Sequence, residues 1–123
     1  MILVDTSIWV DHLRTGHRTL VRLLEEGLVL AHPWVVGELA LGRLSQRTEV
    51  IGLLRSLPAA TVATTDEVIT LVDHHQLYGV GIGYVDAQLL ASTRLTTGAS
   101  LWTRDRRLAA CAERLGCDAD PTT

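Results

Sequence analysis

The chain has 123 residues, of which 47% are hydrophobic and 20% are charged, and its formal net charge at pH 7 is −3. This length fits a single domain over residues 1–123, and the hydrophobic fraction excludes a largely disordered chain. No apolar run approaches the roughly 20 residues that a membrane-spanning helix needs. We therefore expect no contact with a membrane and a location in the cytoplasm.

Short apolar strands and amphipathic helices alternate along the first half of the chain. Residues 2–4 predict a buried strand, which ends at the helix-start signature Asp5-Thr6-Ser7. A second short strand is expected over 28–31, directly before Pro33, which is well placed in the first turn of a helix. The apolar periodicity predicts helices over 7–14, 17–26, 33–44 and 47–57.

The second half of the chain continues the same alternation. Residues 60–63 and 100–103 are expected to be strands, and helices are expected over 64–77, 84–95 and 105–115. Thr64 and Glu67 have the spacing of a capping box, and three glycines punctuate the segment 79–83. Since helices separate the strands, we predict an α/β fold. It is a three-layer sandwich with a central, mainly parallel four- or five-stranded sheet flanked by helices.

Four acidic residues are embedded in, or directly end, apolar stretches: Asp5, Glu38, Asp86 and Asp105. Burial of an isolated carboxylate costs several kcal/mol or more, so such residues are usually paired or bound to a metal ion. Four of them spread along one chain suggest a shared partner that neutralises them all. A hard divalent cation, Mg²⁺ or Mn²⁺, prefers such oxygen ligands.

The predicted topology can bring these four residues together. Asp5 ends the first strand, Asp105 follows the last one, and Asp86 lies in the first turn of the helix after the glycines. Glu38 lies on the helix that follows the second strand. Since ligands of open parallel sheets bind at the carboxyl ends of the strands, we expect all four side chains to converge on that edge.

Each acidic residue also has a structural interpretation. Asp5 and Asp105 could be helix N-caps, and Asp86 could be a favourable charge on a helix dipole. Glu38 could form an ion pair with an arginine. The three tryptophans could fill the core or a subunit interface, or stack on bases.

The cationic side chains are all arginines, eleven in number. Arginine binds phosphate in a bidentate manner, although a bias towards GC-rich codons would also explain the count. Arg104, Arg106 and Arg107 surround Asp105, and with Arg14 they could position a phosphate backbone.

Four motifs in order resemble the PIN-domain family, and specifically the VapC-type toxins of prokaryotic toxin–antitoxin pairs: VDTSIWVDHLR, GELALG, VDAQLLA and LWTRDRRL. The resemblance implies a metal-dependent endoribonuclease that binds Mg²⁺ or Mn²⁺ through an acidic quartet. By position, the quartet is Asp5, Glu38, Asp86 and Asp105, and the hydroxyl residues near it are Thr6, Ser7 and Thr103. The resemblance also implies an RNA substrate, a homodimer, and a small antitoxin protein that covers the acidic pocket.

Two other functions remain open at this point. A catalytically inactive PIN module could bind RNA or a protein, although an intact quartet speaks against it. An aspartate-dependent phosphotransfer domain would also place Asp5 at the end of a strand. It is disfavoured because Ser7 replaces the second acid of a D-x-D pair, and because the chain has no lysine to stabilise a phosphoryl group.

Overall fold

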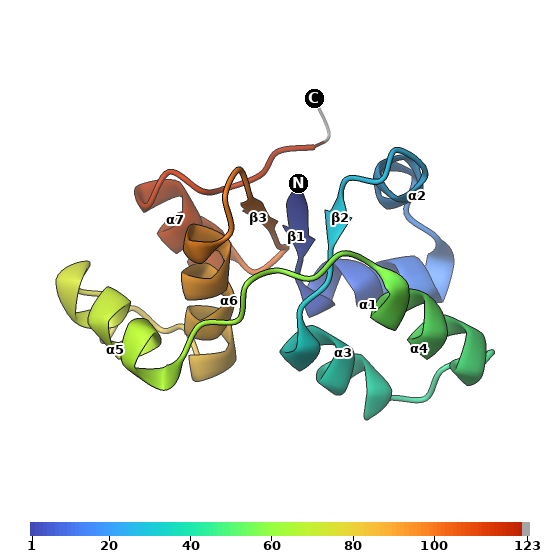
Figure 1. The fold of residues 1–123 in the computed structure, drawn as a ribbon, viewed down its shortest axis with the longest axis horizontal. Coiled ribbons are helices and arrows are strands. Elements are labelled where there is room, and N and C mark those ends of the chain that lie inside the picture. The colour runs from blue at the N-terminus through green and yellow to red at the C-terminus, as the bar shows by residue number, and fades with distance from the viewer. Residues whose placement is uncertain (122–123) are drawn as a thin grey trace.

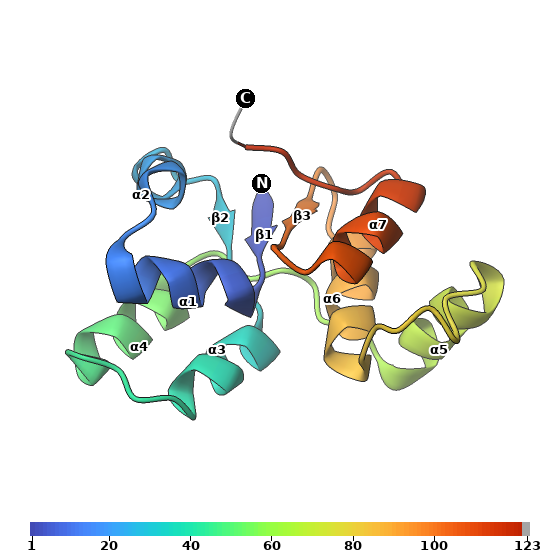
Figure 2. The ribbon, with the colours of Figure 1, turned by 180° about the vertical axis from the view of Figure 1, so that it is seen from behind.

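In the computed structural model, which describes residues 1–121, three parallel strands form the centre of the molecule, with helices on both sides (Figures 1 and 2). The strands are β1 (Ile2–Val4), β2 (Val29–Leu30) and β3 (Ser100–Trp102), in the spatial order β2-β1-β3. Leu3 is in register with Leu30 and with Leu101. The predicted α/β fold with a parallel sheet flanked by helices is confirmed.

The helices are α1 (Thr6–Thr15), α2 (Arg18–Glu25), α3 (Pro33–Ala40), α4 (Arg47–Ser56), α5 (Thr65–His74), α6 (Tyr84–Leu95) and α7 (Arg106–Arg114). Helices α1 to α4 lie at one flank of the sheet and α5 to α7 at the other, as both views show (Figures 1 and 2). The chain therefore passes from one flank to the other through the segment between α4 and α5. Within residues 1–121, no helix has the length and apolar character that crossing a membrane requires.

Two helix starts follow the predicted signals. Pro33 is the first residue of α3. Before α5, the Thr64 hydroxyl accepts the Glu67 N–H at 3.1 Å, and Glu67 Oε1 accepts the Thr64 N–H at 2.9 Å.

Helix α3 ends at Ala40, earlier than the predicted residue 44. The Arg47 guanidinium donates to the carbonyl oxygen of Ala40, the last residue of α3, at 2.5 Å, and to that of Gly42 at 3.3 Å. The bond to Ala40 satisfies a terminal carbonyl group that has no partner within the helix.

The predicted strand over 60–63 is wrong, and the described sheet has three strands instead of four or five. Single bridges extend both edges, from Ala31 to Ala59 and from Leu101 to Asp118. The segment 60–63 cannot continue the ladder, because the Ala63 N–H is directed at side-chain oxygens of α6.

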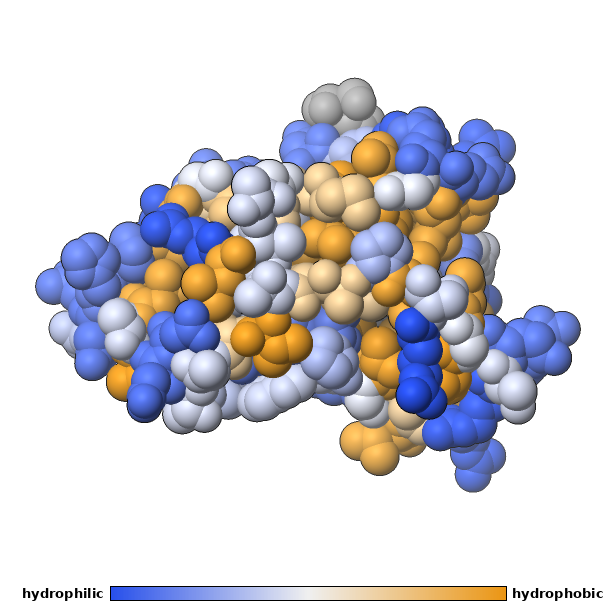
Figure 3. All heavy atoms as spheres, in the orientation of Figure 1, coloured by the Kyte–Doolittle hydropathy of each residue, from blue (hydrophilic) through white to orange (hydrophobic). Residues whose placement is uncertain are grey.

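The core surrounds the strands and fixes their ends. The largest fully buried side chains are those of Trp9, Leu3, Ile8, Leu20, Leu54, Leu89, Leu90, Leu101 and Leu108. Apolar side chains also reach the surface over α5 and α6 and over α3 and α4 (Figure 3), and the Leu41 side chain after α3 is 91% exposed. Because the strands are buried, the residues that follow them start from rigid positions.

Candidate active site

Asp5 directly follows β1, and its side chain is only 7% exposed. It occupies the N-cap position of α1, yet its carboxylate caps no backbone N–H of that helix. Its Oδ2 instead accepts hydrogen bonds from the hydroxyl groups of Ser7 at 2.8 Å and Thr103 at 2.7 Å. The N-cap interpretation of this side chain is therefore wrong, and two hydroxyls hold the buried carboxylate in a fixed orientation.

Glu38 lies on α3 and is exposed, and it connects that helix to α1. Its Oε1 accepts the hydroxyl proton of Thr6 at 2.7 Å. The ion pairs among residues 1–121 are Arg22–Glu26 and Arg104–Asp11, so Glu38 has no arginine partner in the described part of the chain. The structure therefore does not support the prediction that Glu38 forms an ion pair with an arginine.

Asp86 lies half-buried in the first turn of α6, where its Oδ2 accepts the Gly83 N–H at 3.3 Å. Burial raises the pKa of Asp86 above its ordinary value, although the Gly83 hydrogen bond opposes that shift. The negative charges of Asp5, Asp105 and Glu38 raise the pKa further. The fold therefore brings the four predicted carboxylates into one electrostatic environment.

Asp105 precedes α7 and is exposed. Its Oδ1 accepts the Leu108 N–H at 3.0 Å, so the N-cap interpretation is right for this residue. Its own N–H donates to the Thr103 hydroxyl at 3.0 Å, and that hydroxyl also donates to Asp5. Thr103 thus links two of the four acidic residues.

The expectation that all four carboxylates occupy apolar surroundings is only partly right. Asp5 is buried and Asp86 is half-buried, but Glu38 and Asp105 are exposed. Their apolar neighbours Leu39 and Leu108 are buried in the core, but their burial does not extend to the adjoining acidic side chains.

The chemistry of this cluster fits a hard divalent cation. In each carboxylate one oxygen accepts one or more hydrogen bonds, while the other accepts none from residues 1–121. Within that part of the chain, no group of three or more His, Cys, Asp and Glu side chains already stands close enough to hold an ion. Asp5, Glu38, Asp86 and Asp105 are the residues whose remaining carboxylate oxygens would hold such an ion.

Four arginines predicted to contact phosphate have different surroundings. Arg104 pairs with Asp11, and its backbone N–H donates to the Ser7 hydroxyl at 3.1 Å. Arg107 lies across Gly81, which has a φ of +88°, and a Cβ at that glycine would stand 2.6 Å from the guanidinium. Arg106 is exposed at the start of α7.

The fourth, Arg14, lines a groove of about 560 Å³ that begins beside Thr6 and Glu38. Arg43 lines the same groove, and sequence reasoning missed it because nothing in its local pattern separates it from the other arginines. Neither guanidinium is paired with another side chain of residues 1–121. The groove therefore carries available positive charge next to the acidic cluster.

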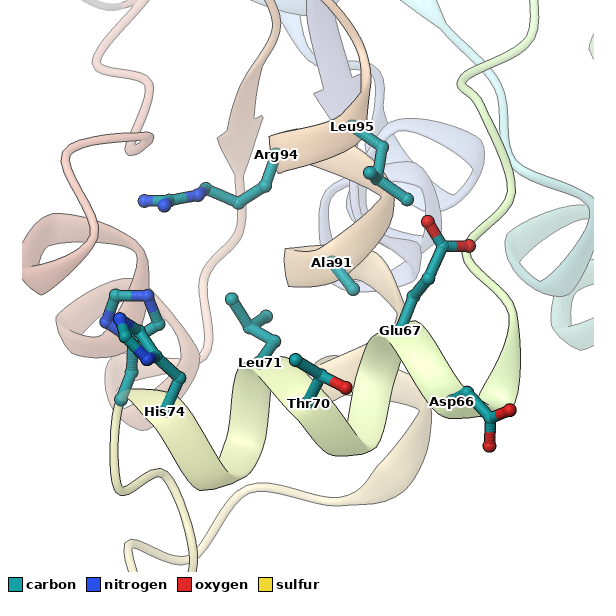
Figure 4. Close-up of a pocket in the computed structure, with 9 residues that line it drawn as sticks. Asp66, Glu67, Thr70, Leu71, His74, Ala91, Arg94 and Leu95 are labelled. Carbon is teal, nitrogen blue, oxygen red and sulfur yellow. The ribbon is translucent and has the colours of Figure 1, made fainter.

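A separate cavity of about 370 Å³ lies between α5 and α6 (Figure 4). Its lining is mainly apolar, with Asp66 and Glu67 towards one end and His74 and Arg94 towards the other. None of the predicted site residues lines it. It is not part of the acidic site.

Comparisons with known proteins identify the family of the chain and its fold. The sequence pattern of the PIN domain matches residues 2–114. The chain is 54% identical over 114 residues to the protein named Ribonuclease VapC32 in Mycobacterium tuberculosis strains CDC 1551 / Oshkosh and ATCC 25618 / H37Rv, covering 92% of each chain. Among solved structures, FitAcB from Neisseria gonorrhoeae has the same fold, with a TM-score of 0.66 and 18% identity over 99% of both chains.

Proposed function

Since the chain belongs to the PIN-domain family, as its motifs predicted, we propose that it is a metal-dependent endoribonuclease acting as the toxin of a toxin–antitoxin pair. The observation that carries the proposal is a hydroxyl network in which Thr103 bonds to both Asp5 and Asp105, and the neighbouring Thr6 bonds to Glu38. None of the four carboxylates is paired with a cationic side chain of residues 1–121. Its relatives named Ribonuclease VapC32 support RNA as the substrate.

Asp5 and Asp86 are the proposed principal metal ligands, and Glu38 and Asp105 complete the set. When bound, Mg²⁺ or Mn²⁺ would lower the pKa of a water molecule and polarise the scissile phosphate. The contribution of the chain is positional. The hydroxyls of Ser7 and Thr103 orient Asp5, and the hydroxyl of Thr6 orients Glu38.

The arginines are proposed to position the RNA backbone. Arg14 and Arg43 line the groove that leads away from Glu38, so they suit phosphates on one side of the cleaved bond. Arg106 and Arg107 lie near Asp105 and suit phosphates on the other side. Arg104 shares its charge with Asp11 and would contribute less.

Family membership supports three further parts of the proposal. A small antitoxin protein would cover the acidic pocket, and the toxin would be a homodimer of single-domain chains. The expected location is the cytoplasm, where the RNA substrate is found.

Cleavage of total cellular RNA by the purified protein tests the proposal. With Mg²⁺ or Mn²⁺ we expect discrete fragments, and with EDTA none. Asp86→Asn should reduce the rate at least about a hundredfold, because it removes a metal ligand while keeping the side-chain volume. Asp66→Asn, which changes an exposed acid in the first turn of α5, is the matched control and should cleave normally.

Normal turnover by EDTA-treated Asp86→Asn protein would contradict the proposal. Failure of the native protein to cleave RNA, with metal bound, would favour the inactive binding module instead.

A further inference from the structure

Trp34 and Tyr84 form an exposed aromatic pair. Their ring centroids are 5.6 Å apart, with 45° between the ring planes. The two side chains are 37% and 42% exposed, whereas Trp9 and Trp102 are buried in the core. The core explains two of the three tryptophans, and the third needs another explanation.

The pair lies at the edge of the acidic site. Trp34 precedes Glu38 by four residues on α3, so the two side chains share one side of that helix. Tyr84 lies in the same first turn of α6 as Asp86. The two rings thus join the helices that carry two of the proposed metal ligands.

A buried network holds the two helix starts together. His32 is fully buried, and its Nδ1 accepts the Trp34 N–H at 3.0 Å. That bond leaves Nε2 as the protonated nitrogen, 3.0 Å from the Ser92 hydroxyl and 3.3 Å from Gln88 Oε1. Gln88 and Ser92 follow Tyr84 by four and eight residues, so all three lie along one stripe of α6. The ring pair is therefore mounted on a rigid support.

We propose that Trp34 and Tyr84 form a stacking platform for an unpaired base of the RNA, next to the phosphate that is cleaved. This inference rests on the proposed ribonuclease function. The neighbouring carboxylates repel a phosphate that no metal ion shields, so neutral rings at this edge suit a base better than the backbone. Aromatic side chains bind every base through its π-face, so the platform selects unpaired nucleotides over paired ones.

Binding of an unstructured eight-nucleotide RNA tests the platform. Ca²⁺, a hard ion with oxygen ligands, replaces Mg²⁺ in the measurement, and tryptophan emission reports on stacking. Trp34→Leu and Tyr84→Leu should each weaken binding about tenfold, and Trp34→Leu should abolish the RNA-dependent quenching. Trp34→Tyr should restore most of the affinity. Tyr78→Leu, which changes a 63% exposed ring outside the site, should bind as the native protein does.

Two results would overturn the platform. The first is unchanged affinity in both leucine variants. The second is a halved mass in solution for those variants, because the rings would then cover a subunit interface. If the native protein neither binds this RNA nor cleaves cellular RNA, the proposed function fails as well. If the native protein cleaves RNA with metal and both leucine variants bind the eight-nucleotide RNA as tightly as it does, only the platform fails.

Discussion

Two polar clusters lie against the same helices, α3 and α6, and differ in how their polar groups are satisfied. The His32 cluster is buried and neutral, and His32, Gln88 and Ser92 each have hydrogen-bond partners. The acidic cluster keeps one oxygen of each carboxylate without a partner from residues 1–121. Burial, and then the charges of the other three acids, raise the pKa of Asp86. In the described residues, the one buried side-chain nitrogen or oxygen without a hydrogen-bond partner is His17 Nδ1, outside both clusters.

The contrast separates a structural polar cluster from a functional one. A buried network whose members are all satisfied contributes to stability and fixes geometry. A group of like charges without a cation opposes folding, and such groups are concentrated at functional sites. Changes in the first cluster should therefore act mainly on stability, and changes in the second mainly on activity.

Replacing His32 should produce the largest loss of stability. His32→Leu removes the acceptor for the Trp34 N–H and the bonds to α6, so we expect a loss of roughly 2–4 kcal/mol in the free energy of unfolding. Urea denaturation measures it. His32→Asn can still accept the Trp34 N–H and should lose less. If His32→Leu were as stable as the native protein, the His32 cluster would not be a stabilising structural cluster.

The same histidine should make stability depend on pH. Burial lowers the pKa of His32 below its ordinary 6.5, so the folded state binds fewer protons than the unfolded state. The stabilisation is complete above pH 6.5 and is lost as the pH falls towards the lowered folded value. The stability difference between native protein and His32→Asn should therefore shrink between pH 7 and pH 5. The pKa values of His12 and His75 are lowered as well, so they also make stability depend on pH in both proteins. Subtracting the stability of His32→Asn from that of the native protein at each pH therefore isolates the contribution of His32.

Metal binding should reverse the instability of the acidic cluster. At a hundredfold excess of Mn²⁺ over its Kd, the native protein should gain about 2.7 kcal/mol over protein in EDTA. Since the pKa of Asp86 is raised, its contribution to stability is present at low pH and is lost as the pH rises through the folded value. Asp86→Asn should therefore be more stable than the native protein in EDTA at pH 7 and gain less from Mn²⁺. Thermal denaturation measures both, with Asp66→Asn as the control.

Local signals in the sequence were enough to predict most of the helices and the four acidic positions. Pro33 and the capping box at Thr64 mark helix starts because each acts within one turn of the chain. The order of strands and helices placed Asp5 after β1, Asp86 in the first turn of α6 and Asp105 before α7, as the structure has them. It did not show that Glu38 and Asp105 are exposed.

Features that depend on contacts between distant residues could not be predicted. Thr61 and Val62 have strand-forming side chains, yet the Thr61 N–H donates to the Thr96 hydroxyl, 35 residues away. The pairing of Trp34 with Tyr84 and the bonds from His32 to α6 span more than 45 residues. None of them leaves a local pattern in one sequence.

The hydroxyl of Thr103 offers the finest test of the comparison, because it lies in the acidic cluster without being a proposed metal ligand. Thr103→Val keeps the shape of the side chain but removes the donor to Asp5 and the acceptor for the Asp105 N–H. We expect about a tenfold fall in the cleavage rate, since supporting groups around metal ligands have effects of this size, and a loss of only about 1 kcal/mol in stability. Thr103→Ser should restore activity, and Thr15→Val, at the end of α1, is the control. If Thr103→Val lowered stability as much as His32→Leu does while cleaving normally, both clusters would be structural and the contrast between them would disappear.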